Sequence, residues 1–88
     1  MFVILVYDIK EERVAKALKT CRKYLTWVQN SVFEGEITEA KLRILKDELK
    51  KIIDDNHDSV LIYKFRTKQY YEREELGIKK PSHEDFII

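Results

Sequence analysis

This chain has few of the residues that build disulfide frameworks, metal sites or flexible loops. Its 88 residues include one cysteine, one proline, two glycines and two histidines. The single cysteine, Cys21, excludes an internal disulfide and a cysteine-built zinc site, and we interpret it as a core residue. A glycine-rich phosphate loop, a histidine pair at metal spacing and a nucleophile–base set are also missing. We therefore expect one compact domain of helices and strands.

The sequence also lacks a long hydrophobic run. The apolar segment 1–7 is far too short to span a membrane. No basic region precedes it, so it does not have the pattern of a signal peptide. We expect a cytoplasmic protein with no membrane partner.

Positive and negative charges nearly cancel, giving a net charge of +1. This balance argues against strong electrostatic attraction between nucleic acid and the molecule as a whole. The first 23 residues are locally basic, with six basic and three acidic side chains. Such a stripe is either a solvated helix face or a contact for phosphates, and both alternatives stay open. The basic residues are Lys10, Arg13, Lys16, Lys19, Arg22 and Lys23.

The segment 1–8 predicts a buried strand, because it is short and rich in β-branched and aromatic residues. Both of its faces are apolar, so both need to be covered. Asp8 ends the strand at its carboxyl edge, where ligands of open sheets usually lie. The alternative is that Asp8 turns the chain or caps the helix that follows.

The remaining pattern predicts alternating helices and strands. Apolar spacing predicts one helix over 10–24 and a second over 39–55, with Thr38 as its N-cap and Asn56 as its C-cap. Strands are expected over 27–29, 32–37 and 59–65, with a tight turn at 30–31. The order strand, helix, strand, strand, helix, strand predicts an α+β, ferredoxin-like fold.

We place this domain at residues 1–76 and a tail at 77–88, with a short extra strand over 85–88. Both helices should cover one face of the sheet, with the first and fourth strands in its middle. The other face would then be apolar and uncovered, which favours a homodimer with the sheets face to face. The last strand would close its own sheet or join the partner's edge.

Asp8 is the carboxylate that we single out as a candidate metal ligand. His57 and His83 lie in predicted loops and are interpreted as surface residues. The cluster Asp54, Asp55 and Asp58 is interpreted as a solvated helix end. A twofold axis near Asp8 would bring a second copy from the partner, and an oxygen-loving cation such as Mg²⁺ would relieve the repulsion.

Two stretches of the sequence resemble the small CRISPR-associated Cas2 proteins of spacer acquisition. The first is Val6-Tyr7-Asp8-Ile9, followed by Arg13-Val14-Ala15 at the start of the first helix. The second is the stretch from Val28 to Gly35, which reads Val-Gln-Asn-Ser-Val-Phe-Glu-Gly. The similarity is strong over roughly the first forty residues, and the rest of the chain matches in plan.

The resemblance implies a homodimer in which the two Asp8 side chains face each other around Mg²⁺, with Mn²⁺ as a substitute. It implies a metal-dependent nuclease for single-stranded RNA or duplex DNA, and a partnership with CRISPR-associated integrases of the Cas1 family. The matching catalytic positions are Asp8 and its neighbour Tyr7, and the matching nucleic-acid contacts are Arg13, Ser31 and Phe33. Trp27 and Glu11 stand where many relatives carry basic residues.

Three functions are therefore compatible with the sequence. The first is a Mg²⁺-dependent endonuclease in which Asp8 holds the metal and Arg13 orients the phosphate. The second is a non-catalytic DNA-bridging scaffold of the integrase complex, in which Lys16 and Lys19 of the basic helix contact the duplex backbone. The third is a small-molecule regulatory module, because ferredoxin-like folds host many functions.

Overall fold

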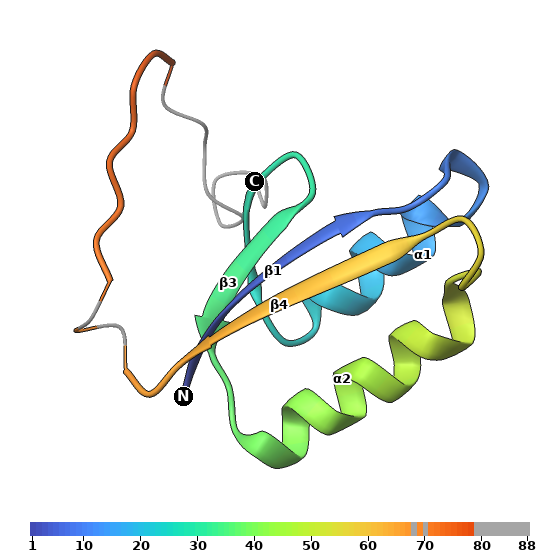
Figure 1. The fold of residues 1–88 in the computed structure, drawn as a ribbon, viewed down its shortest axis with the longest axis horizontal. Coiled ribbons are helices and arrows are strands. Elements are labelled where there is room, and N and C mark those ends of the chain that lie inside the picture. The colour runs from blue at the N-terminus through green and yellow to red at the C-terminus, as the bar shows by residue number, and fades with distance from the viewer. Residues whose placement is uncertain (68, 70, 79–88) are drawn as a thin grey trace.

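A computed structural model describes residues 1–67, 69 and 71–78 (Figure 1). The predicted α+β fold is confirmed. The elements are β1 (Phe2–Asp8), α1 (Glu11–Arg22), β2 (Thr26–Gln29), β3 (Val32–Glu36), α2 (Glu39–Ile52) and β4 (Ser59–Phe65). No helix within this described part is long and apolar enough to cross a bilayer. The predicted strand over 85–88 and the position of His83 lie outside the described residues.

The four strands form one antiparallel sheet in the order β2-β3-β1-β4. The prediction that the first and fourth strands occupy the middle is wrong, since β4 lies at an edge. The hairpin between β2 and β3 places β3 on one side of β1, with Leu5 opposite Phe33. The other side of β1 is then left for β4, where Leu5 lies opposite Ile62. The central strands are therefore β1 and β3.

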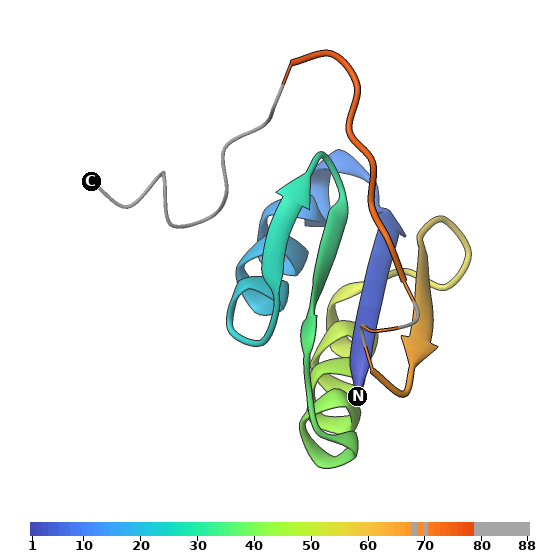
Figure 2. The ribbon, with the colours of Figure 1, turned by 90° about the vertical axis from the view of Figure 1, so that its left-hand side faces the viewer.

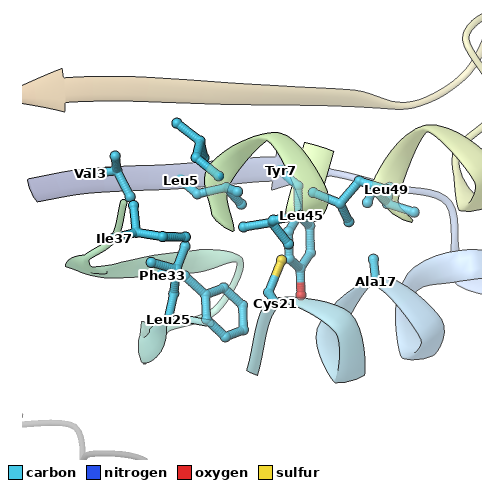
Figure 3. Packing of buried hydrophobic residues seen from close by; sticks show 12 residues of the cluster. Val3, Leu5, Tyr7, Ala17, Cys21, Leu25, Phe33, Ile37, Leu45 and Leu49 are labelled. Carbon is cyan, nitrogen blue, oxygen red and sulfur yellow. The ribbon is translucent and has the colours of Figure 1, made fainter. Parts of the chain in front are cut away.

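Both helices lie on one face of the sheet (Figure 2). Successive residues of a strand point to opposite faces, so Val3, Leu5 and Tyr7 of β1 turn toward the helices and are buried. Figure 3 shows these side chains in one hydrophobic cluster with Cys21 of α1 and Leu45 of α2. Burial raises the pKa of the Cys21 thiol to about 12. This agrees with the core position that we expected for Cys21.

Helix α1 begins one residue later and ends two residues earlier than predicted, and α2 begins as predicted and ends three residues earlier. Thr38 caps α2 as expected, because its Oγ1 accepts a hydrogen bond of 3.1 Å from the backbone N–H of Lys41. The predicted C-cap at Asn56 is wrong, since α2 ends at Ile52 and Ile53 has extended backbone angles. The backbone N–H of Asp54 donates instead to the Asp58 carboxylate, at 2.8 Å, and this hydrogen bond takes the place of the next helical one.

The second face of the sheet, which we call the open face, carries no helix formed by the described residues (Figure 2). Its middle is apolar, with Ile4 and Val6 partly buried and Leu61 and Tyr63 more than half exposed. The end of the open face near Phe2 is covered by a chain segment that follows β4. There the Tyr71 ring lies 4.9 Å from the Phe2 ring and 5.8 Å from the Phe65 ring, measured between centroids.

Glu34 of β3 ties this segment to the sheet. Its carboxylate accepts hydrogen bonds from the Tyr71 hydroxyl at 2.7 Å and from the Arg73 guanidinium at 2.9 Å. The part of the open face that stays uncovered among the described residues therefore runs from Ile4 toward Asp8 at the opposite end of β1.

Candidate functional site at the carboxyl end of β1

The β1–α1 loop and the α2–β4 loop meet at one end of the sheet (Figure 1). Asp8, the last residue of β1, is exposed and lies opposite Ser59, the first residue of β4. It follows Val6 by two positions, so its side chain belongs to the open face. The structure therefore places this carboxylate where the sequence predicted it, at a sheet edge beside an uncovered apolar surface.

A second carboxylate, that of Asp58 in the α2–β4 loop, accepts hydrogen bonds from four N–H groups. Its Oδ1 accepts from the backbone N–H of Lys10 at 2.9 Å and from Nη2 of Arg13 at 3.1 Å. Its Oδ2 accepts from Nε of Arg13 at 2.6 Å and from the backbone N–H of Asp54 at 2.8 Å. The Asp58 side chain has 0% of its surface exposed, and that of Arg13 has 25%.

This geometry changes the interpretation of the acidic cluster after α2. We expected a solvated helix end, but Asp58 is buried in a charge-assisted network. The Arg13 guanidinium holds the pKa of the Asp58 carboxyl well below its usual range. Because both oxygens already accept two hydrogen bonds each, Asp58 is built as a structural anion and not as a metal ligand.

The position of Asp58 near Asp8 could have been predicted from the sequence. In an antiparallel sheet, the residue before β4 falls beside the residues that follow β1, so Asp58 reaches the same edge as Asp8. The spacing of charges could not show that its side chain is buried.

Tyr7 and Phe33 lie in the core, away from the open face. Phe33 is fully buried and Tyr7 is 6% exposed, and their ring centroids are 6.1 Å apart. Burial raises the pKa of the Tyr7 hydroxyl. The ring of Tyr7 extends toward Cys21 (Figure 3). The structure does not bring Tyr7 together with Asp8, and it gives both aromatic rings a packing role.

The basic residues that we expected to bind nucleic acid differ in how accessible they are. Arg13 is engaged with Asp58, whereas Lys16 and Lys19 are exposed on α1. Lys23, farther along the chain, pairs with Glu48 of α2. Ser31 is partly buried, and its carbonyl oxygen accepts a hydrogen bond of 3.1 Å from the backbone N–H of Tyr7.

Within the described residues, no three acidic, histidine or cysteine side chains gather closely enough to hold a metal ion. Asp8 therefore offers one carboxylate, with its outer side open to solvent or to another molecule. Mg²⁺ is commonly held by one or two carboxylates and keeps several waters. An exposed aspartate of this kind fits such an ion if a second carboxylate comes from elsewhere.

Acid should weaken the fold through Asp58. An unfolded aspartate has a pKa of about 3.9, and Arg13 lowers the pKa in the folded chain. The stabilisation is therefore complete above about pH 4 and is lost as the pH falls toward the folded pKa. We expect Asp58→Asn to unfold at a lower temperature than the wild type near neutral pH, with a difference that shrinks in acid. Thermal unfolding followed by circular dichroism measures this, and a pH-independent difference would contradict it.

Comparison with known proteins agrees with this fold. The family model described as CRISPR associated protein Cas2 matches residues 1–73. The chain is 53% identical over 87 residues to proteins named CRISPR-associated endoribonuclease Cas2 from Dictyoglomus turgidum and Pyrococcus furiosus, covering 99% of this chain and 100% of each relative. A structure titled "Crystal structure of cas2" is 46% identical, with a TM-score of 0.85 and coverage of 91% of this chain and 90% of that one. Streptococcus pyogenes Cas2 is 36% identical, with a TM-score of 0.76 and coverage of 88% and 100%. This chain therefore belongs to the Cas2 family of CRISPR-associated proteins.

Proposed function

We propose that this protein is a divalent-metal-dependent nuclease that works as a homodimer in CRISPR adaptation, beside an integrase. One observation carries the proposal: Asp8 is an exposed carboxylate at the rim of an uncovered apolar face. The relatives named endoribonucleases support RNA as the substrate, and we propose that this RNA is single-stranded. Duplex DNA is the alternative substrate of the same site.

The open face supports the dimer. Leu61 is 54% exposed and Tyr63 is 53% exposed, and both lie beside the partly buried Ile4 and Val6. Removing such a surface from water is favourable, and a second copy presents the same apolar surface. Because Asp8 belongs to this face, a twofold axis near the end of β1 would bring the two Asp8 carboxylates of the proposed dimer toward each other.

Paired Asp8 side chains would hold the metal ion. Two carboxylates that face each other repel, and a hard divalent cation offsets that repulsion. When bound, such a cation supplies charge for the phosphate and acidity for a water molecule. The chain itself contributes the Asp8 charge, the fixed backbone around it, and the exposed Lys16 and Lys19 of α1 as contacts for the substrate's phosphates.

Asp8→Asn should reduce the cleavage of single-stranded RNA to background and leave the fold unchanged. The amide keeps the size of the side chain but loses the charge that a hard cation needs. Cleavage by the wild type should stop with a chelator and return with Mg²⁺ or Mn²⁺. Asp55→Asn, which changes an exposed carboxylate in the α2–β4 loop, is the matched control and should keep full activity. Undiminished cleavage by purified Asp8→Asn would refute the role of Asp8.

Leu61→Asp should convert the dimer into a monomer, because it places a charge in a desolvated interface. Ile44→Asp is the matched control, since Ile44 is 50% exposed on α2, on the other side of the molecule. We expect that control to stay dimeric. Sedimentation equilibrium at micromolar concentration distinguishes the two variants, and a wild-type monomer under these conditions would overturn the dimer.

A DNA-bridging scaffold is the second candidate function, and the exposed Lys16 and Lys19 favour it. Neither lysine makes an ion pair within the described part of the chain. Exposed cations at this spacing on one helix face can contact neighbouring phosphates of a backbone.

Duplex binding should therefore depend on these two lysines and on salt. Replacing both by Gln should lower the slope of log affinity against log salt concentration by about 2, since each phosphate contact contributes about 1. Fluorescence anisotropy with a labelled duplex measures the slope. Replacing Lys46 and Lys50 of α2 by Gln is the control and should leave it unchanged. Binding that does not vary with salt would exclude the scaffold in this form.

A further inference from the structure

The backbone at Asp8 and just after it is held by one neighbouring segment. Lys10 lies just before the first residue of α1, and its backbone N–H donates a hydrogen bond of 2.9 Å to Oδ1 of Asp58. Asp8 itself lies opposite Ser59 in the β1–β4 ladder. Two consecutive residues, Asp58 and Ser59, therefore fix the chain at and just after the candidate metal ligand.

The Asp58 side chain has no freedom to move independently of its surroundings. Two nitrogens of Arg13 donate hydrogen bonds to it, at 2.6 and 3.1 Å, and the backbone N–H of Asp54 donates another at 2.8 Å. Its side chain is 0% exposed, so no water competes for these donors. Lys10, the N-cap residue of α1, makes no side-chain cap, and its backbone N–H donates to this distant carboxylate.

We propose that Asp58 is a positioning residue that fixes the backbone presenting Asp8, and that Arg13 acts on the reaction through Asp58 and not through a phosphate. The inference rests on the proposed function of Asp8 as a metal ligand. Functional groups need to be held within about 0.5 Å of their productive geometry, and supporting hydrogen bonds supply that accuracy. Loss of such a support typically costs 10- to 100-fold in metal affinity or activity.

Binding of Mn²⁺ alone tests the proposal without an activity assay. Paramagnetic broadening of the Asp8 and Ile9 amide signals in NMR spectra reports the ion at this site. We expect Asp58→Asn to raise the apparent dissociation constant of Mn²⁺ by roughly 10-fold or more, and to lower the hydrogen-exchange protection of the Lys10 amide. Asp54→Asn is the matched control, since it changes a carboxylate of the same loop and leaves its own backbone N–H in place. It should bind Mn²⁺ as the wild type does.

Kinetics of Arg13→Gln separates the two possible roles of Arg13. A positioning role predicts a lower kcat, an unchanged KM for single-stranded RNA and weaker Mn²⁺ binding. A phosphate contact predicts a higher KM with unchanged Mn²⁺ binding, and that result would overturn the proposal for Arg13. Lys16→Gln, on the exposed side of the same helix, is the reference for a phosphate contact and should raise KM.

The outcomes also separate this inference from the proposed function. If Mn²⁺ broadens the same signals in wild type and in Asp8→Asn, the proposed metal site itself is wrong. If the wild type binds at Asp8 and folded Asp58→Asn binds equally well, the positioning role is wrong. If Asp58→Asn does not fold, Arg13→Gln decides, because it removes the two guanidinium hydrogen bonds that fix the Asp58 side chain, while the bonds of Asp58 to the two backbone N–H groups support the fold. Wild-type Mn²⁺ affinity in that variant would then overturn the proposal.

Discussion

Both helices pack on the same side of the sheet, and this unequal covering determines what each residue of the central strand β1 can do. Val3, Leu5 and Tyr7 turn toward the helices and contribute their burial to stability. Ile4 and Val6 turn to the open face, and Asp8 ends that second row. Alternate residues of this strand thus form part of the core, and the residues between them lie on the open face and include the Asp8 carboxylate. A one-residue shift of its register would exchange the two sets, so the pairing with β3 and β4 specifies the site as strictly as it specifies the core.

Much of this fold could be predicted from the sequence, because its local signals agree with one another. The apolar spacing located both helices, and Thr38 marked the start of α2. The strand order was predicted incorrectly, since β4 is apolar on both faces and such a pattern suggests a central strand. In the folded chain, one face of β4 packs against the helix layer and the other belongs to the open face. The end of α2 was placed too late, because a contact with Asp58 competes with the helical hydrogen bond of Asp54.

The candidate site was predictable where it depends on strand alternation, and less so where it depends on side-chain partners. Asp8 follows directly from its place at the end of β1. Arg13 was interpreted as a phosphate contact, and the structure shows its guanidinium bound to Asp58. Those two residues are 45 positions apart in the sequence, so no local pattern connects them. Phe33 was similarly linked to nucleic acid through its motif, while its ring fills the core. Motif similarity indicates that a residue matters, but burial and partners decide how it acts.

The buried position of Asp58 separates two responses of the molecule to ionic strength. Mobile ions screen exposed charges over about 8 Å at physiological ionic strength, and they screen buried pairs much less. Lys16 and Lys19 are exposed to that screening, whereas the Asp58 end of its pair with Arg13 is sealed from solvent. Salt can therefore loosen contacts made by the helix surface while the loops around Asp8 keep their geometry. A polyanion bound by Lys16 and Lys19, as we propose, would therefore be released as the ionic strength rises, while Asp8 keeps its place for the next one.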